Sequence, residues 1–119
     1  MGWKKAPDKL VAFLAATLQD VACEPRKMFG YPVYFINNNM FIGAHQDDLF
    51  LRLAPEDRDE VHANYDTIKP FEPVPGRMMK EYVVIPPDLY TNPAIFQELL
   101  TKSIRYVASL PQKAKKKSF

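Results

Sequence analysis

Three short apolar runs joined by two tight polar turns constrain the fold of this chain more than any other feature. The runs cover residues 33–36, 40–42 and 49–53, and each is rich in the β-branched and aromatic residues typical of strands. The first turn is Asn37-Asn38-Asn39, and asparagine tolerates the positive φ that tight hairpins require; the second is Gln46-Asp47-Asp48. Links this short impose antiparallel pairing, so the sequence predicts a three-stranded meander.

Helical patterns flank this meander on both sides. Proline and aspartate, both typical entry residues, precede an apolar stripe that predicts a helix over residues 8–21. Near the other end, Asn92 and Pro93 form an N-cap and first-turn pair that opens a long amphipathic helix, and this helix ends before Pro111. Because the apolar face of a small sheet needs cover, we expect the first and last helices to pack on one face.

The segment between the meander and the last helix is less regular. Residues 55–64 begin with proline and are mostly charged, which predicts a short, exposed helix. Residues 69–76 contain three prolines and should run extended, outside the centre of any sheet, with a short strand near Phe71 as an option. We expect a type II turn at residues 74–77. The sequence predicts another strand at residues 82–85. The fold class predicted is α+β, in the order α-β-β-β-α-β-(β)-α.

Composition and charge set limits on function. The 119 residues are 47% hydrophobic and 25% charged, which fits one globular domain over residues 1–112. Residues 113–119 should form a flexible basic tail with lysines at Lys113, Lys115, Lys116 and Lys117; without these four, 12 basic residues face 14 acidic ones, a net charge of −2. Such a tail adds only weak, salt-sensitive attraction to nucleic acid. With no run of about 18 apolar residues and the single Cys23, we expect a cytoplasmic domain without a membrane partner.

The sequence carries no recognisable catalytic or cofactor motif, since phosphate-loop, dinucleotide and zinc-protease patterns are all missing. His45, Asp47 and Asp48 are metal-ligand types, but they lie at a predicted hairpin tip where aspartate favours the turn itself. With His62 as the second of two histidines, no metal site is expected. Cys23 is expected to be a structural thiol, not a nucleophile. We therefore predict no catalytic residue and no cofactor.

Two motifs carry a resemblance to a known family. They are Arg26-Lys27-Met28-Phe29-Gly30 and Gly76-Arg77-Met78-Met79, with Asn39-Met40-Phe41 and residues 49–53 between them. In order and spacing, residues 8–111 resemble the N-terminal domain of the TfoX/Sxy family, which implies a meander sheet flanked by helices. Full-length members are bacterial regulators of competence for DNA uptake that act with a cyclic-AMP receptor protein and carry a second, helical domain. Because the resemblance already covers residues 8–111 of the 119, we expect a stand-alone regulatory domain without that second domain.

The candidate binding residues surround the two motifs. If both motif loops lie on one side of the sheet, Arg26 and Arg77 flank one groove, and arginine forks suit a carboxylate or a phosphate. The residues predicted to bind a ligand or partner there are Arg26, Lys27, Phe29, Tyr31, Tyr34, Arg77 and Met78. The alternative is that the two arginines pair internally with Glu24, Glu81 or backbone carbonyls and lock the loops.

Other motif residues are expected to serve the structure. These are Met28, Gly30, Asn39 and Gly76, with the two glycines supplying backbone geometry. We expect the side chains of Met28, Phe29 and Met79 to lie in the core and not on a binding surface. We expect non-enzymatic action through a protein partner or a homodimer, because the aromatic residues suit a protein groove and open sheet edges favour self-association. The alternatives are a small-ligand or anion-binding domain, and an enzyme that uses the arginine groove.

Overall fold

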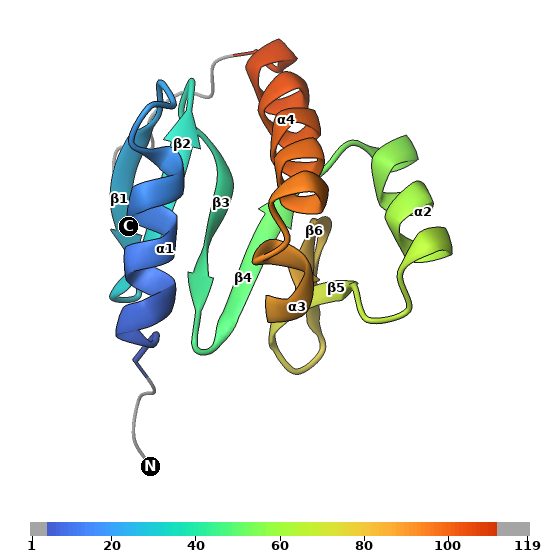
Figure 1. Cartoon of the computed structure of the whole chain (residues 1–119), viewed down its shortest axis with the longest axis horizontal. Coiled ribbons are helices and arrows are strands. Elements are labelled where there is room, and N and C mark those ends of the chain that lie inside the picture. The colour runs from blue at the N-terminus through green and yellow to red at the C-terminus, as the bar shows by residue number, and fades with distance from the viewer. Residues whose placement is uncertain (1–4, 112–119) are drawn as a thin grey trace.

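The computed structural model describes residues 5–111 of the chain, which contain four helices and six strands (Figure 1). In chain order, the elements are α1 (Asp8–Leu18), β1 (Glu24–Met28), β2 (Tyr31–Ile36), β3 (Asn39–His45), β4 (Asp48–Arg52), α2 (Pro55–Asn64), β5 (Lys69–Val74), β6 (Arg77–Ile85), α3 (Pro87–Tyr90) and α4 (Pro93–Ser109). The described residues contain no helix that is long and apolar enough to cross a membrane. The predicted tail over residues 113–119 lies outside the described residues.

All six strands form one antiparallel sheet in the order β1-β2-β3-β4-β6-β5. The first four strands are a meander whose tight turns hold residues at positive φ, among them Asn37 and Asn38 at 52° and 64°. After α2, the chain returns to the outside of the sheet as β5 and then inserts β6 beside β4. The α+β fold predicted from the sequence is confirmed.

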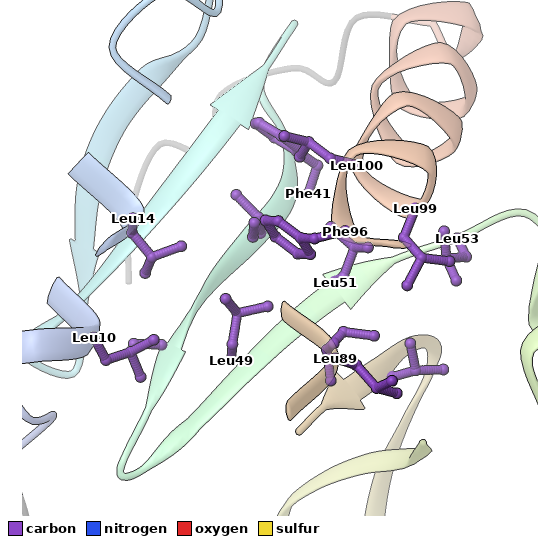
Figure 2. Packing of buried hydrophobic residues seen from close by; sticks show 14 of the residues in the cluster. Leu10, Leu14, Phe41, Leu49, Leu51, Leu53, Leu89, Phe96, Leu99 and Leu100 are labelled. Atoms are coloured by element: carbon purple, nitrogen blue, oxygen red, sulfur yellow. The ribbon is translucent and has the colours of Figure 1, made fainter. Parts of the chain in front are cut away.

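Helices α1 and α4 cover the same face of the sheet, as the sequence predicts (Figure 1). Leu14 on α1 is fully buried and Leu99 on α4 is 4% exposed; both belong to the same buried cluster as Phe41 of β3 and the leucines of β4 (Figure 2). The amide of Asn92 caps α4: its Oδ1 accepts a hydrogen bond from the Ile95 backbone N–H at 3.3 Å. Such caps satisfy a helix N–H group that has no partner within the helix.

A second buried cluster lies on the opposite face of the sheet, and its side chains come from β2, β3, β4, β5 and β6. Its members are Val33, Met40, Phe50, Phe71 and Tyr82. The pairing of β5 with β6 is irregular: Pro70 pairs with Val83, but the next residue, Phe71, pairs with Met79. Three extra residues of β6 therefore lie between these two pairs. This bulge bends the β5–β6 hairpin over the sheet, and the Phe71 ring stacks on Phe50 with centroids 4.5 Å apart. The hairpin thus covers a face that no large helix covers.

Several boundaries differ from the sequence-based expectations. Helix α1 ends at Leu18 instead of residue 21, and β6 begins at Arg77 instead of residue 82. The sequence did not predict a strand at Glu24–Met28, which is the edge strand β1, and it did not predict the short helix α3. The proline-rich segment 69–76 supplies the other edge strand, β5. That location fits its prolines, because an edge strand does not need every N–H for pairing.

Candidate functional site

The tip of the β1–β2 hairpin combines strain with exposure. The turn consists of Phe29 and Gly30, with φ of 54° and 85°, a geometry that normally selects asparagine, aspartate or glycine. A bulky residue such as phenylalanine is rare at positive φ. Its side chain is nonetheless 80% exposed. The expectation that Phe29 belongs to the core is therefore wrong. Phe29 and Gly30 together form the Phe29 tip, and the side chain of Phe29 is the main candidate contact with a partner.

Arg26 is held by neighbours on its own side of the sheet. Its Nη2 donates to Glu24 Oε1 at 2.9 Å and to the side-chain oxygen of Asn38. Its guanidinium lies 4.1 Å from the centroid of the Phe35 ring, a cation–π contact. The structure therefore shows the internal pairing with Glu24 that the sequence left open. Lys27, by contrast, is exposed beside the Phe29 tip.

Arg77 and Met78 lie on a different hairpin. Both begin β6 and are exposed, next to a turn in which Gly76 has a φ of 84°. The Gly76 backbone N–H donates to Glu72 Oε2 at 2.6 Å, so this carboxylate closes the turn. Three strands separate β1 from β6 in the sheet order, and the contacts of Arg26 described above all come from the β1–β3 part of the sheet. The structure does not bring the two arginines together.

The remaining predicted residues are mostly packed. Tyr31 is buried, with its ring 5.1 Å from that of His45. Tyr34 is half-buried. Burial is the main cause that raises the pKa of its phenol, and the nearby Cys23 raises this pKa further. The amide of Asn39 is buried and donates to Asn37 O and Pro111 O. These three side chains are internal parts of the sheet, unlike the side chain of Phe29.

The two methionines that the sequence assigned to the core, Met28 and Met79, are partly buried against the second cluster. This agrees with their expected structural role. Gly30 and Gly76 both occupy the positive φ for which glycine was expected at these turns.

An open depression of about 310 Å³ lies between the β3–β4 turn and β5; the sequence did not indicate it. We call it the β5 depression. It is lined by His45, Gln46, Asp48, Thr67, Lys69, Pro70, Phe71, Glu72, Pro73 and Val84. The His45 ring forms part of its wall and contacts the Phe71 ring at 5.5 Å. The segments that form it are distant along the chain, so no local pattern marks the site.

The cysteine and histidine side chains considered above for catalysis or metal binding have the following surroundings. Burial raises the pKa of the half-buried Cys23 thiol, which favours the protonated form over the reactive thiolate. Within residues 5–111, no group of three or more His, Cys, Asp or Glu side chains is placed to hold a metal ion. His62 Nδ1 lies 3.2 Å from the Ile68 carbonyl oxygen, at the loop between α2 and β5.

A polar cluster that the sequence did not reveal joins α4 to the sheet. Arg52 Nε donates to Glu81 Oε1 at 2.6 Å, and the Tyr106 hydroxyl of α4 donates to the same oxygen at 3.3 Å. Next to it, the Tyr82 hydroxyl donates to Met40 O at 3.0 Å. Burial is the main cause that raises the Tyr82 pKa to about 12. Because its members hydrogen-bond to one another, this cluster stabilises the fold.

Six antiparallel strands, two helices on one face and an exposed aromatic tip define a small α+β domain with its candidate site on a hairpin. A model of the TfoX N-terminal domain family matches residues 14–107. The chain therefore belongs to the TfoX N-terminal domain family, and the resemblance seen in its motifs is confirmed. No curated protein and no solved structure gives a significant match.

Proposed function

We propose that this chain is a non-enzymatic, cytoplasmic regulatory domain that acts by binding a protein through the Phe29 tip. One observation carries the proposal: Phe29 is 80% exposed while its backbone is held at a φ of 54°. Backbone strain of this kind persists where the surrounding structure imposes it, and it concentrates at functional sites. Aromatic residues are also enriched among the residues that dominate binding energy at protein interfaces.

The surroundings of the tip support a protein partner over nucleic acid. Lys27 supplies a positive charge beside Phe29, but Arg26 is already paired with Glu24. Without the four tail lysines the chain carries a net charge of −2, whereas a nucleic-acid surface needs a basic excess. Membership of the TfoX N-terminal domain family supports a regulatory type of domain, and the family is not known for enzymatic activity.

The test is affinity capture from a bacterial lysate with the full chain and with Phe29→Asn. Asparagine accepts positive φ, so the variant should fold at least as stably as the parent while it loses the aromatic contact. We expect Phe29→Asn to lose the proteins that the parent retains. Val11→Ser, which changes an exposed apolar side chain on α1, should retain them.

Thermal melts of the three proteins check that each is folded. An unchanged set of captured proteins with folded Phe29→Asn would overturn the proposal. So would tight binding of the chain to duplex DNA at physiological salt that persists after deletion of residues 113–119.

A further inference from the structure

The Phe29 tip and the β5 depression lie at the same end of the sheet. Strand β2 starts directly after the tip and runs antiparallel to β3, so the β3–β4 turn comes back to that end. Contacts agree with this placement, because the ring of Tyr31, two residues after Phe29, packs against His45 in the wall of the depression. An exposed aromatic side chain and a hollow therefore lie at the same end of the sheet.

The depression suits the size of one aromatic side chain, and its lining is partly apolar and partly polar. A volume of about 310 Å³ is at the lower end of the range for ligand sites, which is room for one aromatic side chain. Pro70, Phe71, Pro73 and Val84 supply apolar lining. The lining carries the carboxylates of Asp48 and Glu72 and the ammonium group of Lys69, a net negative charge, whereas Lys27 beside Phe29 is positive.

We propose that the β5 depression binds Phe29 of a second copy of this chain, so that two copies form a two-fold symmetric dimer. In such a dimer the same pair of surfaces meets twice, each tip entering the other subunit's depression. Because tip and depression lie at the same end of the sheet, both can face one two-fold axis. The inference rests on the proposed function in one respect, that Phe29 is the contact residue.

Pairing of edge strands is a poorer route to a dimer for this sheet. The two-residue turn makes Met28 and Tyr31 a hydrogen-bonded pair, and alternation then directs the backbone of Pro25 and Lys27 outward from β1. Proline has no N–H group to donate to a further strand, and a charged lysine on an edge strand disfavours the pairing of a further strand. At the other edge, β5 contains Pro70 and Pro73. Prolines on both edge strands therefore disfavour strand addition.

The test is the mass of the full chain in solution, measured by sedimentation equilibrium over a wide concentration range. The 13.7 kDa chain should approach twice that mass at high concentration. Phe29→Asn removes the tip, and Thr67→Trp fills the depression from an exposed position. Each should weaken the dimer by about tenfold or more, as expected for a central contact residue. Val11→Ser, at an exposed apolar position of α1, is the control and should dimerise like the parent.

A mixture of the two variants makes the test specific. Phe29→Asn keeps an intact depression and Thr67→Trp keeps an intact tip, so the mixture can form one of the two contacts. We expect the mixed pair to associate more tightly than either variant alone.

A parent that stays monomeric at millimolar concentration, or a dimer that tolerates Thr67→Trp, would overturn the inference. The proposed function fails separately. If the parent is monomeric but captures proteins that Phe29→Asn loses, the proposed function stands and the dimer does not.

Discussion

At the scale of single residues, two buried positions on the face opposite the large helices carry unusual constraints. Tyr82 has its hydroxyl bonded to Met40 O inside the protein, and Gly43 sits where strand β3 passes close to its neighbours. Neither residue belongs to the proposed binding surface. Both determine whether the second cluster, which supports the β5–β6 hairpin, can pack.

Tyr82 should make stability fall at high pH. Its pKa is raised from 10.0 to about 12, mainly by burial, so the folded state holds the phenol proton more tightly than the unfolded state. The resulting stabilisation is complete below pH 10 and is lost as the pH rises from 10 to 12, a loss of roughly 2–3 kcal/mol. Urea unfolding between pH 8 and pH 12 measures it. Tyr82→Phe should flatten this pH dependence, and an unchanged slope would contradict the assignment.

Gly43→Ala should destabilise the domain by about 1–3 kcal/mol, the usual cost of overpacking. An added Cβ would lie 2.7 Å from Val33 Cγ1 and 2.8 Å from Phe50 Cζ, closer than carbon atoms approach. Urea midpoints measure the effect. Because Val33→Ala removes one of the clashing methyl groups, the double variant should be less destabilised than the sum of the two single variants. Strict additivity would show that the clash is relieved elsewhere.

At the scale of elements, the two hairpins that carry the motif arginines differ in how they use them. In the β1–β2 hairpin, Arg26 joins Glu24 on its own strand to Phe35 and to Asn38 of the next turn. In the β5–β6 hairpin, a carboxylate closes the turn, and Arg77 is exposed. The first arginine is therefore part of the hairpin's own structure.

Arg26→Ala should lower the free energy of unfolding by about 1–2 kcal/mol, since it removes a cation–π contact and two side-chain hydrogen bonds. Arg77→Ala should change it by less than about 0.5 kcal/mol, as is usual for an exposed site. Thermal and urea unfolding of both variants make the comparison. Equal losses at the two sites would restore the idea that both arginines lock the fold.

At the scale of the whole molecule, the sequence predicted the elements whose patterns are local. The meander and the two covering helices follow from periodicity and from turn residues such as Asn37 and Asn38. Strand β1 was missed because Glu24–Met28 contains proline and three charged residues, and it becomes a strand only by pairing with β2 across a turn without asparagine. The β5 depression was missed because sheet order, not sequence, brings β5 to the β3–β4 turn.

Helix cover over the sheet gives the largest expected losses of stability. Leu14→Ala and Leu99→Ala each remove a buried side chain from the core between the helices and the sheet (Figure 2). Each should cost about 2–5 kcal/mol, measured from urea midpoints. Val11→Ala, at a position of α1 that is 36% exposed, is the control and should cost far less. A neutral result at both leucines would contradict the packing of α1 and α4.

The buried amide of Asn39 affects the order in which native contacts can form while the chain is being synthesised. Its hydrogen bond to Pro111 O spans 72 positions, from the start of β3 to the residues just after α4. The turns and strands of the meander can pair while the ribosome is still adding later residues, since their contacts are close in sequence. This bond cannot form until residue 111 has left the exit tunnel. A chain that ended before residue 111 would keep the bond from the Asn39 amide to Asn37 O and would lack its second acceptor.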